Sequence, residues 1–204
     1  YVLSALAVLP VRLLGGVNFA QQIRINMLLL RQFISVLPMI LSALLLVYML
    51  TRLKSRFYSI ALFVFLLFIP GVVKYNVLFW HPDSLAILFV VLTFYFLQRD
   101  DFRFGRHWVL AAIACGLASS TRLLGFFCGL AVAYMLLVAL FTRKVPLKKL
   151  LLAGLVFVLV MSAVIALSSP YLFLPSARAR FAEILAEKQH EMKFGYDDPD
   201  PQHI

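Results

Sequence analysis

The chain has 204 residues, of which 63% are hydrophobic and 14% charged, and its net charge is +10. Soluble domains are roughly 45–50% apolar and about 25% charged, so this composition excludes an ordinary soluble domain and predicts a membrane protein. The cations stand in short stretches between apolar runs, which indicates topology signals and anionic lipid headgroups as partners, not nucleic acid.

The apolar runs predict an all-α fold, a polytopic bundle of about six transmembrane helices plus an amphipathic helix on the outer face. Three regions follow from the pattern. Residues 1–27 hold a truncated span or interfacial helix and an external loop, 28–168 form the bundle, and 169–204 form an external loop with the amphipathic helix. Because the chain begins at Tyr1 inside an apolar run, we expect a fragment of a longer protein.

Six spans are expected along the chain. In order they are Leu28–Leu50, Phe57–Val73, Ser84–Leu97, Trp108–Thr121, Leu123–Phe141 and Leu150–Leu167. A span needs about 20 residues, so the third and fourth are short. Pro38 predicts a kink in the first span.

Small residues at four-residue spacing predict two seams of close helix packing in the second half of the bundle. The seams are Ala112, Gly116 and Ser120, and Gly125, Gly129 and Ala133. Cys115 and Cys128 fall inside apolar runs, which predicts packing residues and not a disulfide.

Basic loops set the expected orientation. The loops rich in Lys and Arg are Thr51–Arg56, Arg99–His107 and Thr142–Lys149. They alternate with sparsely basic loops, so the positive-inside rule predicts that they are cytoplasmic. Asp83, Arg122 and everything after Ser168 then lie on the outer or lumenal face of a multi-pass protein of the plasma membrane or endoplasmic reticulum.

The segment Ser176–Met192 predicts the amphipathic helix. An apolar stripe runs along it, while Glu183, Glu187 and Glu191 recur at i, i+4 on the opposite face. Such a helix lies along a membrane surface.

Asp83 is the only acidic residue between positions 1 and 99. It begins the third span and Arg122 follows the fourth, and the short loop between these spans makes them an antiparallel hairpin. Packed helix axes lie about 8–10 Å apart, so both side chains could reach one polar recess at the outer end. The alternative is a structural ion pair in which Asp83 is a favourable charge at a helix N-terminus.

The segment that precedes Asp83 holds four further candidate site residues. Lys74 and the free N–H groups of the following helix could bind an anion. Tyr75 and Trp80 could line that site or belong to an interfacial aromatic belt. His81 could contact substrate or have a local hydrogen-bonding role. No metal-ligand spacing, Walker loop, nucleophile elbow or dinucleotide fingerprint occurs, so the cofactor stays unknown, a divalent cation being one option.

The chain also resembles a known family over about Leu28 to Gly195. The resemblance is carried by four blocks in this order: LLLRQFISVLPMILSALLLVYMLTRL, HPDSLAILFVVLTFYFLQR, AAIACGLASSTRLLG and SPYLFLPSARARFAEILAEKQHEMKFG. Their order is similar to that in the GT-C superfamily of integral membrane glycosyltransferases, nearest to the protein O-mannosyltransferase and aminoarabinose-transferase-like group.

The resemblance implies transfer of a sugar from a polyprenyl-phosphate carrier to an acceptor on the outer or lumenal face. Asp83 matches the family's acidic residue at the start of a later span, which implies a catalytic role. Arg122 matches a basic residue that faces the carrier phosphate, although lysine is common there. The family's first external loop carries another acidic residue, but Val17–Asn26 holds none. Either that residue lies upstream of Tyr1, which fits a fragment, or this chain is not a competent transferase.

Two other functions stay open at this point. One is a transporter or lipid-carrier flippase in which Asp83 and Arg122 form a gating pair. A transporter should show a second related half with interrupted helices, and no such repeat occurs in this sequence. The other is a non-catalytic membrane scaffold.

Overall fold

The computed structural model describes residues 9, 19–74, 82–142, 145–169, 178–179, 182–184, 186–187 and 189. The chain divides into two compact units, Tyr1–Ser168 and Ser169–Ile204. Every regular element in the described ranges is helical, which confirms the all-α prediction.

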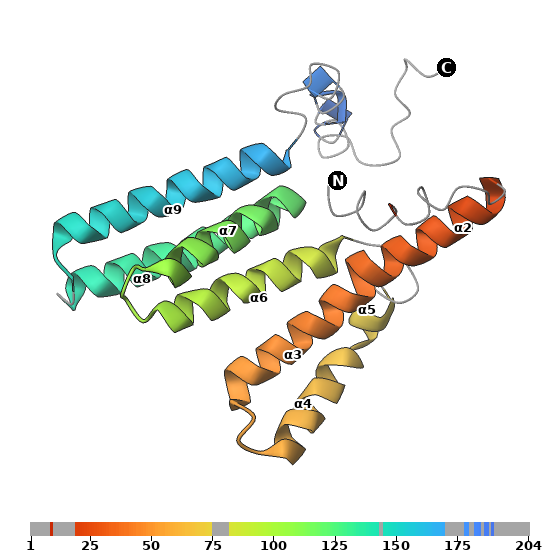
Figure 1. Cartoon of the computed structure of the whole chain (residues 1–204), viewed down its shortest axis with the longest axis horizontal. Helices are drawn as coiled ribbons and strands as arrows, with labels where there is room; N and C mark the ends of the chain where they lie inside the picture. The colour runs from red at the N-terminus through yellow and green to blue at the C-terminus, as the bar shows by residue number, and fades with distance from the viewer. Residues whose placement is uncertain are drawn as a thin grey trace. The chain divides into compact units, whose positions relative to one another are not determined.

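The first unit is drawn with its helix labels in Figure 1. In chain order its elements are α2 (Phe19–Leu30), the π-helical stretch η1 (Arg31–Val36), α3 (Leu37–Thr51), α4 (Arg56–Leu67), α5 (Pro70–Val73), α6 (Asp83–Asp100), α7 (Arg106–Thr121), the 3-10 turn η3 (Leu123–Phe127), α8 (Cys128–Phe141) and α9 (Leu147–Ser168).

α2, η1 and α3 form one continuous helix. The segment predicted to lie at the surface before residue 27 is helical from Phe19 onward. Pro38 has no N–H group, and its ring crowds the carbonyl four residues earlier. The wider π-helical turn of η1, directly upstream of Pro38, is the distortion that the helix adopts at this place.

The helix ends correct several predicted spans. α6 has 18 residues and extends past the predicted Ser84–Leu97 at both ends, whereas α7 has 16. The second span is interrupted, because α4 ends at Leu67 and α5 begins at Pro70. In the described residues, two helices are long and apolar enough to cross a membrane, Ile23–Thr51 and Leu147–Ser168.

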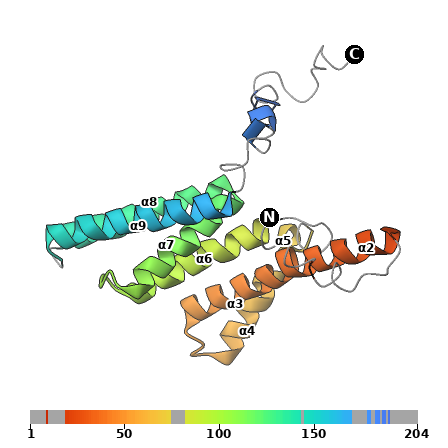
Figure 2. The same ribbon diagram turned by 45° about the horizontal axis from the view of Figure 1, so that its top comes forward.

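α6 and α7 form the predicted antiparallel hairpin, and α9 packs along α7 (Figure 1, Figure 2). The core around α7 consists of Leu97, Trp108, Ala111, Ala112, Cys115, Cys128, Val132, Ala153 and Phe157. Trp108 anchors it, because its indole N–H donates to the Ala153 carbonyl at 2.9 Å and its ring meets Phe157 edge-on at 5.1 Å. Both cysteines are buried free thiols, as the packing interpretation expects.

The first small-residue seam is confirmed, whereas in the second only Gly125 packs closely against another element. A Cβ at Gly116 would lie 2.9 Å from the Met161 carbonyl oxygen, so α7 approaches α9 closely there. A Cβ at Gly129 would meet nothing within 4 Å, and Ala133 is exposed. That face of α8 therefore packs against no other described helix.

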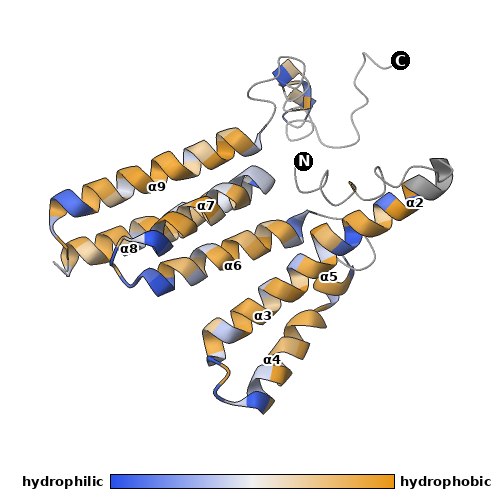
Figure 3. Cartoon of the chain, viewed as in Figure 1, coloured by the Kyte–Doolittle hydropathy of each residue, from blue (hydrophilic) through white to orange (hydrophobic). Residues whose placement is uncertain are grey.

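The outside of the first unit is apolar. Large side chains point outward along several helices; Phe57 is 82%, Leu130 68% and Leu151 66% exposed. Figure 3 shows hydrophobic colour along the length of the helices and hydrophilic colour at their ends. In the two long apolar helices, only 33% and 17% of the most apolar window is buried, so most of each window is exposed.

In the second unit, the described residues of the predicted amphipathic segment are helical. Glu183, Ile184 and Glu187 are all exposed. Phe181, Leu185 and Met192, which complete the apolar stripe, lie outside the described residues, so the amphipathic character stays a prediction.

Candidate functional site

Asp83 is the first residue of α6. Pro82 precedes the helix, and its carbonyl accepts from the N–H groups of Leu85 and Ala86 at 3.1 and 3.2 Å. A proline at this point is compatible with a helix start because the first N–H groups have no partner within the helix. The carboxylate of Asp83 therefore lies at the positive end of the helix dipole, where a negatively charged side chain stabilises the helix.

Arg122 lies where α7 ends, in an extended conformation with φ −148° and ψ 136°. Its N–H donates to the Ala118 carbonyl, and its own carbonyl accepts from the Gly125 N–H, both at 2.9 Å. A Cβ at Gly125 would lie 2.3 Å from the Ser119 nitrogen, so only glycine lets η3 fold back on the end of α7. This turn holds Arg122 at the same end of the hairpin as Asp83.

The structure brings the two predicted charges into direct contact. The Arg122 Nε–H donates to Asp83 Oδ1, across 39 positions of sequence. The side chains are 47% and 48% exposed, respectively. An ion pair this exposed contributes about 0–1 kcal/mol to stability, so it can open at little cost when a ligand competes for either partner.

The other sequence candidates are placed less fully. Lys74 directly follows α5, and its side chain is exposed. Tyr75, Trp80 and His81 lie outside the described residues. Their place around Asp83 therefore stays a prediction.

Beside the start of α6 is an apolar cavity that sequence patterns did not indicate. Its volume is about 140 Å³ and it lies between α3, α4 and α6. It is lined by Met39, Ser42, Ala43, Leu46, Leu66, Leu67, Ile69, Val72, Ser84, Ile87 and Val91. Ser84, which follows Asp83 in the chain and is buried, is the lining residue nearest in sequence to the ion pair.

Asp100 is a second acidic residue whose place the sequence reading missed. It falls in the predicted polar loop Arg99–His107, but it is the last residue of α6 and 2% exposed. Its carboxylate accepts from the N–H groups of Phe104 at 2.6 Å, Gly105 at 3.0 Å and Trp108 at 3.2 Å. The sequence signal for this position is an Asp shortly before Gly105, the residue that precedes α7. Its role is to hold the hairpin turn.

Chemically, the site offers a cation and a carboxylate, and the residue after Asp83 lines an apolar cavity. In the ranges that the structure describes, no group of three or more His, Cys, Asp or Glu side chains could hold a metal ion. Arginine is suited to phosphate because its fork of N–H groups can donate two hydrogen bonds to one anion. The arrangement could therefore receive a phosphate that carries a hydrocarbon chain.

Comparison with known proteins adds no relative. No family model matches the sequence, and neither a curated protein nor a solved structure matches it. The resemblance to GT-C enzymes thus rests on the order of the four sequence blocks alone.

Proposed function

We propose that the first unit is a membrane bundle of about six spans with the Asp83–Arg122 pair on its outer face. Two long apolar helices and the outward-facing Phe and Leu side chains support this proposal, because such a surface suits lipid better than water. Retention of the protein in membranes washed with alkaline carbonate checks the proposal, and release into the wash contradicts it.

We further propose that the protein is a glycosyltransferase that moves a sugar from a polyprenyl-phosphate carrier to an acceptor. The observation that carries this proposal is the half-exposed Asp83–Arg122 pair at one end of the α6–α7 hairpin, beside an apolar cavity. A cation suits the phosphate of the donor, and the cavity suits part of its hydrocarbon chain. The resemblance of the sequence blocks to GT-C enzymes supports the same reaction.

In this mechanism the donor phosphate takes over Arg122 from Asp83. The acceptor attacks the anomeric carbon, so a new bond to the sugar forms while the bond between the sugar and the phosphate oxygen breaks. The leaving phosphate keeps the electron pair, and Arg122 stabilises its charge. Asp83, released from Arg122, orients the acceptor and can take its proton. Lys74 is the second candidate for holding the phosphate.

Transfer assays on single variants test this proposal. Asp83→Asn and Arg122→Ala should each abolish sugar transfer from a panel of polyprenyl-phosphate monosaccharides, while membrane insertion and thermal stability stay near those of the parent. Asp101→Asn and Arg56→Ala are matched controls, because these exposed residues lie at the other end of the hairpin and at the start of α4. Near-normal transfer by both site variants would rule out the site.

A second function is favoured by one feature of the same pair. Each charge satisfies the other, which is what a gating ion pair in a transporter or flippase requires. In that case Arg122→Ala would change the rate at which polyprenyl phosphate crosses a liposome bilayer, and no variant would show sugar transfer. A parent protein that transfers sugar excludes this alternative.

A further inference from the structure

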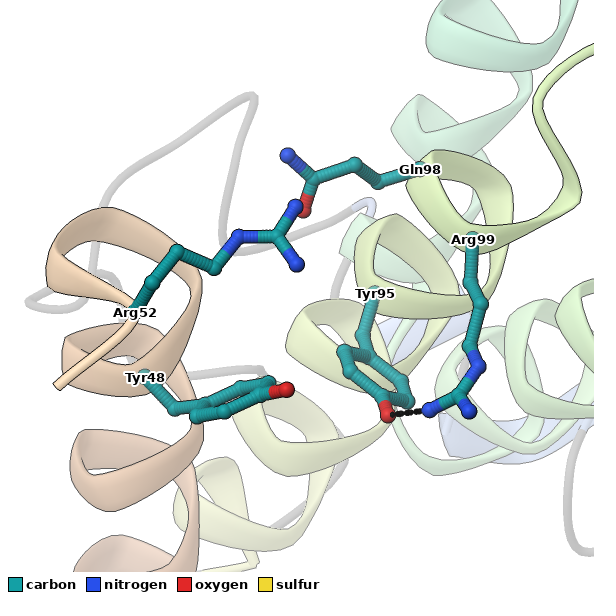
Figure 4. A pocket seen from close by; sticks show the side chains of 5 residues that line it. All are labelled: Tyr48, Arg52, Tyr95, Gln98 and Arg99. Atoms are coloured by element: carbon teal, nitrogen blue, oxygen red, sulfur yellow. Dashed lines mark hydrogen bonds between the residues drawn. The ribbon is translucent and has the colours of Figure 1, made fainter.

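A second polar cavity lies at the opposite end of α6 from Asp83. Its volume is about 220 Å³, and it opens between the C-terminal ends of α3 and α6. The lining residues are Tyr48, Arg52, Tyr95, Gln98 and Arg99 (Figure 4). At about 1.5 Å per helical residue, Arg99 is some 24 Å along α6 from Asp83. This cavity is therefore separate from the proposed transfer site.

The lining carries two positive charges and no negative one. In the part of the chain that the structure describes, no carboxylate lies within salt-bridge distance of Arg52 or Arg99. The rings of Tyr48 and Tyr95 form an aromatic wall, with centroids 6.3 Å apart. Two guanidinium groups that line one cavity, with no acidic partner among the described residues, favour an anionic occupant.

Arg99 is held in place before any ligand arrives. Its Nη1–H donates to the Tyr95 hydroxyl at 2.5 Å, and its Cζ lies 5.9 Å from the centre of the same ring. Because the Tyr95 oxygen accepts this bond, its own O–H stays available as a donor. A fixed arginine loses less conformational freedom on binding than a flexible one.

Arg52 reaches the cavity from the other helix. It is the residue at which the chain leaves α3, with φ 51°, and its N–H donates to the Tyr48 carbonyl at 2.9 Å. This left-handed turn directs the side chain across the gap toward Gln98, as Figure 4 shows. The cavity thus presents guanidinium, hydroxyl and amide donors from both helices.

A neighbouring cavity of about 480 Å³ also touches Arg99 but does not have this character. Its lining includes Asp100 and Asp101 besides Arg103, Arg106 and His107. The exposed Asp101 would repel an anion there. The smaller cavity, whose described lining consists of cations and neutral donors, is the better anion site.

We propose that the cavity between α3 and α6 binds a phosphate group. Arginine forks and hydroxyl donors match phosphate oxygens, and two cations balance the charge of a phosphate diester or monoester. The phosphate belongs either to an anionic lipid headgroup at the membrane surface or to a soluble phosphate compound. Binding here is independent of sugar transfer at Asp83.

The proposal is tested by native mass spectrometry of the full chain in detergent. Phosphatidylglycerol should remain bound more than phosphatidylcholine, and Arg52→Gln and Arg99→Gln should each weaken this binding by about tenfold or more, as loss of a charge-assisted hydrogen bond predicts. Arg56 lies at the start of α4, close in sequence to Arg52, but does not line the cavity. Arg56→Gln removes the same charge and should retain lipid binding. Tyr95→Phe keeps the ring and should weaken phosphatidylglycerol binding less than Arg99→Gln does. It replaces Arg99→Gln in the test if that variant does not fold.

A competition arm distinguishes the two sources of phosphate. If millimolar inorganic phosphate leaves the phosphatidylglycerol bound, the occupant is the lipid headgroup. If inorganic phosphate displaces the lipid from the parent protein and does not bind to the Arg52→Gln variant, the occupant is a soluble phosphate compound. An equal loss of binding in Arg56→Gln, or no loss in Arg52→Gln and Arg99→Gln, overturns the proposal.

Discussion

Asp100 and Asp101 are adjacent carboxylates with opposite environments. Asp101 is exposed, whereas Asp100 is buried and accepts hydrogen bonds from three backbone N–H groups. The turn that follows contains non-glycine residues with positive φ, Asp101 at 46°, Phe102 at 61° and Phe104 at 53°. Such conformations are unfavourable for bulky side chains, so the turn depends on Asp100 to hold it.

Replacing Asp100 by Asn should therefore destabilise the protein. Asn keeps one acceptor oxygen but turns an NH₂ donor toward a backbone N–H, and we expect a loss of about 2–4 kcal/mol. Thermal unfolding in detergent measures this loss. Asp101→Asn is the matched control and should be nearly neutral, because Asn tolerates the left-handed conformation. Equal effects of the two substitutions would contradict the role given to Asp100.

For single residues, the sequence predicts which side chains are candidate site residues better than it predicts which of them are buried. Asp83 is conspicuous because no other acid lies before position 99, and the structure finds it in contact with Arg122 as the hairpin predicted. The burial of Asp100 could not be predicted, because two neighbouring Asp residues look alike until the turn that folds over one of them is known.

The end of α7 and the turn η3 form the element that positions Arg122. Gly125 is buried there, and an added Cβ would lie 2.3 Å from the Ser119 nitrogen and 2.4 Å from the Ala118 carbonyl carbon. Backbone atoms cannot move aside as a flexible side chain can. The turn must therefore shift if this glycine gains a side chain.

Gly125→Ala should lower stability by about 1–3 kcal/mol, the usual range for overpacking, and should separate Arg122 from Asp83. Gly129→Ala is the control, since its Cβ would enter open space and should be neutral or slightly stabilising. Thermal unfolding of both variants in detergent measures the difference. If Gly125→Ala is as stable as Gly129→Ala, η3 does not fold back on α7 as described.

Helices were predictable from the apolar runs, but their ends were not. α6 extends beyond the predicted Ser84–Leu97 at both ends, because polar residues at its termini continue the helix while lowering its hydropathy. The seam through Gly129 failed because four-residue spacing of small residues fixes a face of a helix, but not whether another helix covers it.

At the scale of the whole first unit, polar chemistry is divided between two ends. The Asp83–Arg122 pair lies at one end of α6, and the cavity with Arg52 and Arg99 lies at the other. The sequence predicted this division from alternating basic loops and one isolated acid. The apolar cavity lined by Ser84 and the cavity lined by Arg52 and Arg99 could not be predicted. Each is formed between helices whose contacts no sequence pattern specifies.

The central claim is that Asp83 and Arg122 act on a donor phosphate and are not merely a structural pair. The most direct measurement compares Asp83→Arg and Arg122→Asp, singly and combined, for thermal stability and for transfer from polyprenyl-phosphate sugars. The combined variant can form the ion pair again but presents reversed charges to the donor. We predict that it keeps the stability of the parent and transfers no sugar. Transfer restored to the parent's rate in the combined variant would contradict the claim.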